Sequence, residues 1–409
     1  MFKKTIISEF FTTVSFKQAL YSLYLMTFWF YKLKNWKEEI LFKEKILEKI
    51  KLKWDFFTFY NWRSTIYHAL RIIWVTVDDE VIISSYTCSV VVNSVLQSKA
   101  KLIYSDIEKE TLWLDLESLK KNISKKTKVI ILQNTFWKKS KNYDEIIDLA
   151  QKNNILIIED CAHSLWNFSE YKWDFIVFST GRDKVISSVT GWILVVNNKR
   201  YFWRKITQES PSTKLILKNL MYNIVWYKAY ILYDFFKLWR ITIYLSRKLW
   251  IITEILDNKE KNLSSSNFNL AFPNALAYLA LKELNNLDKY TKVRLKNSAY
   301  YLKNIKNDKI KIIFKDLKNY NWFRFPILLR SEEEKNKLYK IARKNNIILW
   351  NTWSGTNIVP FWVDLQKAKY IPGSCPISED ISKRILTLPN HKFIVKKDMD
   401  RVIEILNNF

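Results

Sequence analysis

The chain alternates short apolar runs with longer segments in which apolar and polar residues recur at helical spacing. Runs rich in Ile and Val occupy residues 81–83, 128–132, 155–159 and 175–178, whereas 143–152 has a helical pattern. Short β-branched runs are typical of strands that are buried on both faces of a parallel sheet. The repeated order of strand and helix therefore predicts an α/β fold, with a mostly parallel sheet sandwiched by helices.

The last part of the chain shows the same signals on a smaller scale, with a predicted strand at 323–329 and a predicted helix at 332–346. We expect three parts: an N-terminal arm with helices at 1–50, a large domain at 51–290, and a small C-terminal α/β domain at 291–409. A chain of 409 residues is long enough for two or three such units.

An apolar helical insertion at about 212–256 interrupts the large domain. Charged residues break it before any run of about 18 apolar residues is reached, so we expect helices that do not span a membrane. Two interpretations stay open: basic amphipathic helices can lie on an anionic membrane surface, or they can pack on the large domain or on a dimer partner. The interrupting residues are Lys218, Lys228, Asp234, Lys237 and Arg240.

The first 30 residues begin like a signal peptide, because basic residues precede apolar ones. Glu9 and Lys17 interrupt the apolar run, however, and no small-residue cleavage site follows. We therefore expect a structural arm or helix, which could cover a partner subunit, rather than a cleaved export signal.

The chain has a formal net charge of +27 and three isolated cysteines. Such an excess of Lys and Arg attracts nucleic acid, anionic membranes or anionic substrates. No run of five basic residues occurs, and Lys is abundant together with Ile, Asn, Tyr and Phe, as in a gene of low GC content. We expect no nucleic-acid partner. The cysteines have neither metal-site nor disulfide spacing, which favours a reducing cytoplasm and no metal site.

Polar residues suited to a reactive cofactor follow two of the apolar runs. Asp160 comes directly after 155–159, and Ser179 and Lys184 come after 175–178. In open α/β sheets, ligands bind beyond the carboxyl ends of the strands, so the carboxylate and the amine can face one ligand. This pair suits pyridoxal phosphate, because a lysine forms a Schiff base with it while a buried acid keeps its pyridine nitrogen protonated.

The stretch 155–192 resembles the signature of the DegT/DnrJ/StrS sugar aminotransferases, which are fold type I pyridoxal phosphate enzymes that aminate keto sugars carried on nucleotides. The family pattern runs E-D-x-A-Q/H, then G-D, then S-F/T-x-x-x-K, then G-G. This chain matches it with Glu159, Asp160, Ala162, His163, Asp174, Ser179, Lys184 and Gly191. Trp173 and Trp192 stand where the family has Gly. The resemblance covers about residues 50–205 and 262–409.

The resemblance implies a role for each matching side chain. Lys184 would form the Schiff base and move protons, and Asp160 would hold the pyridine nitrogen. Ser179 would bind the phosphate, and His163 would pack on or bond to the ring, unless it is an ordinary strand-end histidine. Some relatives are dehydratases with His in place of this lysine, so Lys184 favours the aminotransferase branch.

Further cofactor-binding candidates precede this stretch. A helix begins near residues 63–65, and the resemblance implies that Ser64 and Thr65 bind the phosphate at its N-terminus, where N–H groups lack partners. The alternative is an ordinary helix cap by Asn61 or Ser64. Cys88 stands where the family has an aromatic residue that stacks on the ring, and Tyr86 is a weaker candidate for supplying that ring.

Three residues are candidates for contact with the substrate. Asn134 would lie near the cofactor or the sugar, and Trp353 and His391 lie in segments that border the substrate in relatives. Each has an alternative role in a loop or in the core. Asn267 and Asn269 belong to a loop that reaches the other subunit's cofactor in relatives, so the resemblance implies a homodimer.

The chain is unusually poor in glycine and rich in tryptophan. It has 4 Gly and 18 Trp, whereas a usual Gly content of about 7% would give roughly 29. Gly reaches positive φ in tight turns without strain, so four are few for this length. We hypothesise that many Trp codons are UGA read as glycine in the source organism; the alternative is a genuinely Trp-rich protein. The best candidates, at turns or strand ends where the family has Gly, are positions 54, 62, 74, 113, 137, 166, 173, 192 and 350.

We therefore expect a cytoplasmic, homodimeric aminotransferase that acts on a nucleotide-linked keto-deoxysugar in cell-surface polysaccharide biosynthesis, with glutamate as the amino donor. Any peripheral contact with the inner membrane surface would come from the insertion at 212–256. Two alternatives remain: a non-catalytic membrane-surface or scaffold protein on a degenerate aminotransferase fold, and another fold type I pyridoxal phosphate enzyme.

Overall fold

The structure is a computed structural model, and it describes residues 4–8, 14–50, 55–61, 63–136, 140–164, 173–202, 204–254, 262–264, 268–317 and 323–409. Six positions singled out in the sequence lie outside these residues: Glu9, Trp54, Trp62, Trp137, Trp166 and Asn267.

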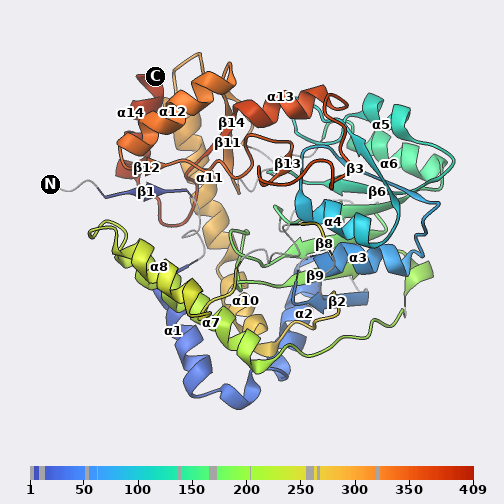
Figure 1. Cartoon of the computed structure of the whole chain (residues 1–409), viewed down its shortest axis with the longest axis horizontal. Coiled ribbons are helices and arrows are strands. Elements are labelled where there is room, and N and C mark those ends of the chain that lie inside the picture. The colour runs from blue at the N-terminus through green and yellow to red at the C-terminus, as the bar shows by residue number, and fades with distance from the viewer. Residues whose placement is uncertain are drawn as a thin grey trace.

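A seven-stranded sheet forms the centre of the described part of the chain (Figure 1). Its strands are β2 (Asp55–Phe59), β3 (Glu80–Ser84), β5 (Lys101–Ser105), β6 (Thr127–Gln133), β7 (Leu156–Asp160), β8 (Phe175–Ser179) and β9 (Trp192–Val196). The spatial order is β2-β9-β8-β7-β6-β3-β5, and the five strands from β8 to β5 are parallel. Antiparallel pairing of β9 with β8 and of β2 with β9 completes one edge. The predicted α/β fold with a mostly parallel sheet is confirmed.

Helices cover both faces of the sheet because successive strand residues point into two different apolar cores. The helices are α3 (Arg63–Ile72), α4 (Ser89–Gln97), α5 (Leu116–Asn122), α6 (Tyr143–Lys152) and α10 (Asn274–Leu284). Ile158 of β7 belongs to the core that includes residues of α3 and α4. Its neighbour Ile157 belongs to the opposite core, which includes residues of α6 and α10. The strand ends between these layers are therefore fixed from both sides.

A smaller α/β unit follows. Its elements are α11 (Leu287–Asn304), β10 (Lys311–Ile312), β11 (Phe325–Leu328), α12 (Glu332–Lys344), β12 (Ile347–Ile348), β13 (Ile358–Val359), α13 (Pro376–Arg384), β14 (Ile385–Leu388) and α14 (Lys396–Asn407). The strands β10, β11 and β14 form an antiparallel sheet, and β13 pairs with β4 (Thr87–Cys88) of the large domain. Residue 291, where we predicted the small domain to begin, lies inside α11. Leu287 of this helix packs in the large-domain core and Tyr301 in the core of the smaller unit, so one continuous helix joins the two.

The described N-terminal residues pack on their own chain. The short β1 (Ile6–Ile7) pairs in parallel with β12, and cover of a partner subunit by this arm stays a prediction. Four further elements are α1 (Phe16–Thr27), η1 (Phe30–Lys32), α2 (Lys37–Ile50) and, after β9, η2 (Lys199–Tyr201).

The insertion is helical, as predicted, and consists of α7 (Thr213–Ile231) and α8 (Leu238–Lys248). Figure 1 shows it along the lower left of the molecule, where α7 packs beside α1 and α8 packs on α7. Within the described ranges, no helix is both long and apolar enough to cross a membrane.

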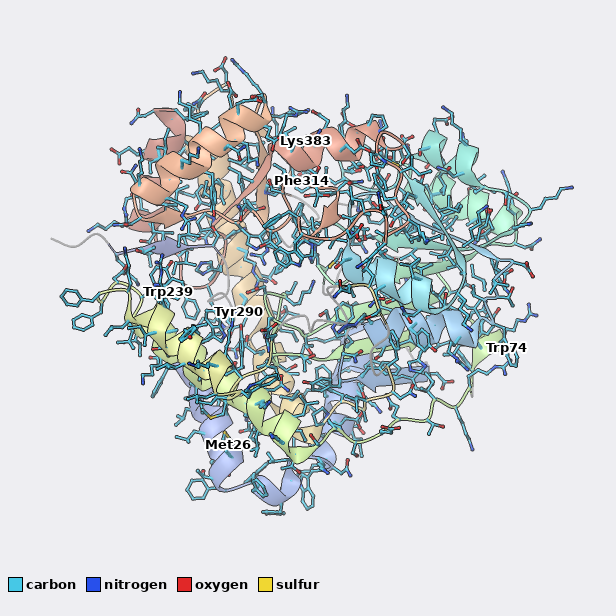
Figure 2. The ribbon with its side chains drawn as sticks, viewed as in Figure 1. Met26, Trp74, Trp239, Tyr290, Phe314 and Lys383 are labelled. Carbon is cyan, nitrogen blue, oxygen red and sulfur yellow. The ribbon has the colours of Figure 1, made fainter. Side chains whose placement is uncertain are left out.

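Two tryptophans occupy backbone positions that favour glycine. Trp74 has φ +60° directly after α3, and Trp250 has φ +56° after α8. Bulky residues are rare at positive φ, and Gly is the usual residue at the left-handed turn that ends a helix. Figure 2 shows the Trp74 side chain at the outer edge of the molecule, where it is 66% exposed. Among the candidate positions for glycine that the structure describes, Trp74 alone has a positive φ, whereas Trp250 was not among the candidates.

Candidate active site

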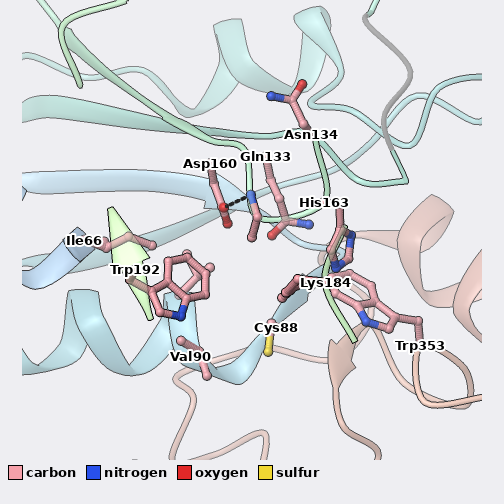
Figure 3. A pocket seen from close by; sticks show the side chains of 12 residues that line it. Ile66, Cys88, Val90, Gln133, Asn134, Asp160, His163, Lys184, Trp192 and Trp353 are labelled. Carbon is pink, nitrogen blue, oxygen red and sulfur yellow. Dashed lines mark hydrogen bonds between the residues drawn. The ribbon is translucent and has the colours of Figure 1, made fainter. Parts of the chain in front are cut away.

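A cavity lies at the carboxyl ends of β6, β7 and β8 (Figure 3). Asp160 is the last residue of β7 and Gln133 the last residue of β6, and these two residues are partners in the parallel ladder. The loop after β8 brings Lys184 to the same space. The described residues that line it are Ile66, Cys88, Val90, Val91, Gln133, Asn134, Asp160, Ala162, His163, Lys184, Trp192 and Trp353.

Asp160 presents a buried carboxylate to the cavity. Its Oδ1 accepts a hydrogen bond of 3.0 Å from the N–H of Ala162, and the residue is 5% exposed. Burial raises the pKa of this carboxyl group, while the bond from Ala162 and the charge of Lys184 oppose the shift. Among the described residues no Lys or Arg lies within ion-pair distance of it. A buried carboxylate of this kind fits a ligand that brings its own positive charge.

Lys184 faces the same cavity from the loop between β8 and β9. Burial lowers the pKa of its ammonium group, and the neighbouring Cys88 and Asp160 oppose the shift. A lowered pKa favours the neutral amine, which is the form that reacts with a carbonyl group.

Two buried arginines from the C-terminal part of the chain hold the backbone on each side of Lys184. Arg324 donates from Nη2 to the carbonyl oxygen of Asp183 at 3.2 Å. Arg294 donates from Nη2 to the carbonyl oxygen of Val185 at 3.0 Å. The position of the amine therefore depends on residues more than 100 positions away in the sequence.

His163 and Trp353 form an aromatic wall of the cavity. The imidazole stacks on Phe136, with ring centroids 5.9 Å apart, and meets Trp353 edge to face at 4.8 Å. Burial lowers the pKa of His163 well below its usual value, with the charges of Lys184 and Arg324 acting in the same direction. The imidazole is therefore neutral. The structure brings both predicted residues to the cavity.

The hydroxyl groups predicted to bind phosphate do not lie among the described lining residues. Ser64 donates from its backbone N–H to Oδ1 of Asn61 at 3.2 Å, which is the helix-cap alternative, and Thr65 is fully buried beside it. Ser179 uses its Oγ to accept the N–H of Gly181 at 3.1 Å. The Ser64 hydroxyl donates to the same Asn61 oxygen, whereas the Ser179 hydroxyl holds a local backbone group, so binding of the phosphate by Ser64, Thr65 and Ser179 stays a prediction.

Cys88 lines the cavity, as predicted, whereas Tyr86 does not. The Tyr86 ring is buried in the core of the smaller unit, and its hydroxyl donates to the carbonyl oxygen of Trp353 at 2.5 Å. Burial raises the pKa of the Cys88 thiol. Cys88 therefore meets the ligand space without supplying a ring to stack on it.

Asn134 and His391 are engaged elsewhere. Asn134 borders the cavity, but its Nδ2 donates to Oε1 of Glu159 at 2.7 Å, and Figure 3 shows its side chain pointing away from Lys184. His391 is absent from the described lining residues, and its Nε2 lies 2.8 Å from the carbonyl oxygen of Ile7. These contacts favour the loop and core alternatives for the two residues.

Gln133 was missed as a lining residue, whereas an indole at position 192 was expected to crowd the site. Gln133 ends β6 in the same way as Asp160 ends β7. Because ligands bind beyond the carboxyl ends of strands in open α/β sheets, its position could have identified it. Trp192 begins β9, and its indole lies between Ile66 and Lys184 in Figure 3. The Nζ of Lys184 lies 6.0 Å from the centroid of this ring. The residue that we expected to be glycine thus occupies part of the cavity with its side chain.

The chain matches the model of the DegT/DnrJ/EryC1/StrS aminotransferase family over residues 38–172 and 254–407. It is 21% identical over 358 residues to the GDP-perosamine synthase of Escherichia coli O157:H7, covering 85% of this chain and 84% of that protein. It is 25% identical over 141 residues to the spore coat polysaccharide biosynthesis protein SpsC of Bacillus subtilis, covering 33% of this chain and 36% of that protein. The fold is similar to that of NtdA from Bacillus subtilis, solved with bound PMP, with a TM-score of 0.74, 16% identity, and coverage of 99% of this chain and 86% of that one.

The residues of the cavity fit the pyridine nitrogen and the carbonyl group of pyridoxal phosphate. Asp160 would hold the pyridine nitrogen, Lys184 would meet the carbonyl carbon, and His163 would lie against the ring. When bound, the cofactor supplies an electron-withdrawing ring on which an amino group is carried between two substrates. This buried acid and amine, together with the match over most of the length, establish that the chain belongs to the DegT/DnrJ/EryC1/StrS aminotransferase family and is a pyridoxal phosphate-dependent aminotransferase.

Proposed function

We propose that the protein transfers an amino group from glutamate to a keto-deoxysugar carried on a nucleotide, as a step in cell-surface polysaccharide biosynthesis. The observation that carries the proposal is the convergence of Asp160, His163 and Lys184 in one buried cavity. The similarity to a GDP-perosamine synthase over most of both chains supports a nucleotide-linked sugar as the acceptor. The shorter match to a spore coat polysaccharide biosynthesis protein supports the pathway class.

The side chains of the cavity have different roles in the reaction: attack on a carbonyl carbon and proton transfer, compensation of charge, and hydrogen bonding. The neutral form of Lys184, which burial favours, can attack a carbonyl carbon and can afterwards take up and return a proton at Nζ. Asp160 is ready to ionise once a cationic group lies against it, because an opposite charge nearby lowers a carboxyl pKa. The neutral imidazole of His163 can donate one hydrogen bond to a ligand oxygen without adding charge.

We further infer that the enzyme is a homodimer in the cytoplasm, with the insertion at 212–256 near the inner membrane surface. The dimer rests on the resemblance described above. In this conformation the carbonyl oxygen of Asn269 accepts the N–H of Glu209 within the chain, at 2.8 Å. Sedimentation velocity tests the dimer directly, and a monomer with full activity would refute it.

We also propose that Trp74 and Trp192 stand where the natural protein has glycine. Trp74 is a bulky residue at φ +60°, and the Trp192 indole takes up space in the cavity. The codons for these two residues and peptide mass spectrometry of protein from the source organism test the proposal together. UGG codons at both positions would overturn it.

The activity test combines the Trp192→Gly chain, in which the cavity is open, with pyridoxal phosphate, glutamate and a GDP-linked keto-deoxysugar, and follows both the amino sugar and the keto acid formed from glutamate; the variants below are made in this background. We expect Lys184→Ala to fold but to lose turnover and the visible absorbance of lysine-bound cofactor. The control Lys205→Ala, at an exposed lysine, should keep both. Turnover retained by Lys184→Ala would refute the role of that residue. Cofactor absorbance without amination of any nucleotide keto sugar would instead favour another fold type I reaction.

A further inference from the structure

The outer face of α8 and the turn before it expose a group of large apolar side chains. Phe236 is 82% exposed and Leu249 is 65% exposed, although burial of such side chains is strongly favourable in water. We call this group, with the basic residues among it, the α8 face. Its apolar members are Phe235, Phe236, Ile241, Tyr244, Leu245 and Leu249.

The inner side of α8 is already occupied. Ile243 and Ser246 are buried, and Ile243 packs in a core cluster with residues of α7. The outer residues Tyr244 and Leu245 lie three and four positions after Ile241, so the three side chains form a stripe on one side of the helix. A helix that is apolar on both sides is normally buried on both, yet the chain covers only one. A contiguous exposed patch of this kind marks a contact surface.

The charges within the α8 face are all positive. Lys237, Arg240, Arg247 and Lys248 lie in or beside the stripe, and no Asp or Glu occurs from 235 to 253. The Nζ of Lys248 lies 5.8 Å from the centroid of the Tyr244 ring. The apolar stems of Lys and Arg side chains can lie along an apolar surface while their charged ends reach into water. The face therefore combines apolar contact with attraction for anions.

We propose that the α8 face binds the surface of a bilayer that contains anionic phospholipid. Such a surface offers negative headgroups and an apolar interior within a few ångströms of each other, which matches this mixture of side chains. α8 would lie in the plane of the interface, with Phe235 and Phe236 entering deepest.

A second copy of the chain fits this face less well. In a two-fold interface a patch that meets itself brings like charges together, so four cations would face four cations. The acid directly before the face, Asp234, already accepts hydrogen bonds from the N–H and hydroxyl of Thr5. Other surfaces of the copy are also basic on average, because the chain carries a net charge of +27. The charge balance therefore favours lipid over a protein copy as the occupant.

The inference rests on the proposed position of the insertion near the membrane, but not on the sugar chemistry. The test is co-sedimentation of the full-length protein, with pyridoxal phosphate in the buffer, with vesicles of phosphatidylglycerol and phosphatidylcholine and with vesicles of phosphatidylcholine alone. Lys184→Ala is tested beside it and should bind vesicles equally well. A failure of the proposed enzyme activity would thus leave this measurement unaffected.

We expect binding only to the anionic vesicles, weakened by salt. Phe235→Ser with Phe236→Ser should weaken it about tenfold, and Lys237→Gln with Lys248→Gln about fivefold for each charge removed. The matched controls Ile371→Ser and Lys340→Gln, at exposed positions outside the insertion, should change little. Absence of binding, equal binding to both vesicle types, or equal losses in the controls would overturn the proposal. So would dissociation of a dimer by the double Phe variant, since that result assigns the face to a second copy.

Discussion

Replacement of Trp192 by glycine tests whether the indole occupies space that the cofactor needs. Trp192 is 4% exposed, lines the cavity and begins β9, where its backbone pairs with Ser179 and Phe59. Removing a buried Trp side chain costs about 3–5 kcal/mol of folding free energy. Glycine within a strand costs about 0.5–1 kcal/mol more than alanine. Without cofactor, Trp192→Gly should therefore be about 4–6 kcal/mol less stable than the parent chain.

Cofactor should restore part of this loss in the variant and little of it in the parent. A ligand present at 100 times its dissociation constant stabilises the folded state by about 2.7 kcal/mol. If the indole blocks the site, the variant gains that amount from pyridoxal phosphate, while the parent chain gains much less. Urea unfolding with and without cofactor measures both gains, and the visible absorbance of lysine-bound cofactor reports occupancy.

Equal stabilisation of both proteins by pyridoxal phosphate would refute the idea that the indole blocks the site. Trp226→Ala is the control, because Trp226 is also buried but lies on α7, outside the described lining residues. It should lose stability without gaining cofactor. Trp192→Ala is a second form of the test if the glycine variant does not fold, because alanine suits a strand better.

Three further changes test the surroundings of the site. Arg324→Gln removes the bond to the carbonyl oxygen of Asp183, so we expect kcat to fall about tenfold with little change in KM. Loss of a cation should also raise the pKa of Lys184 and move the pH profile of the activity upward. Arg324→Lys should restore part of kcat and part of the pH profile. An unchanged pH profile would leave Arg324 with a purely structural role. Gly191→Ala puts a Cβ 2.5 Å from the ring of Phe272 at a backbone φ of +132°. It should lower the free energy of unfolding by about 2 kcal/mol or more. Gly373→Ala has open space around it and should lower the stability less, so equal thermal stabilities of the two variants would contradict the prediction. Burial lowers the pKa of His391 to about 4, so the unfolded chain binds a proton at a higher pH than the folded chain does. The free energy of unfolding should therefore drop between pH 6.5 and 4, by up to about 3 kcal/mol. Urea unfolding of His391→Gln should show a smaller drop, and the same pH dependence in both proteins would contradict the role of His391.

The sequence by itself determined the strand–helix order and the centre of the site. The apolar runs around 155–159 and 175–178 became β7 and β8, because a short β-branched segment buried on both faces has few alternatives. These two strands are neighbours and parallel, so Asp160 and the loop with Lys184 meet at one edge of the sheet. The pattern of apolar residues, together with the binding of ligands at the carboxyl ends of parallel strands, was sufficient to predict that these two residues meet.

Only the tertiary structure decided how the surroundings of Lys184 are built. Arg294 and Arg324 grip its loop from more than 100 residues away, and β1 pairs with β12 across nearly the whole chain. Local periodicity carries no information about such partners. The direction of a polar side chain was equally hidden, because Ser64 and Ser179 can serve either a ligand or a nearby group of the chain, as Ser64 does with Asn61 and Ser179 with the N–H of Gly181. Residue type and spacing thus fix which groups reach the end of a strand, whereas long-range packing and competing hydrogen bonds decide which of them face the cavity.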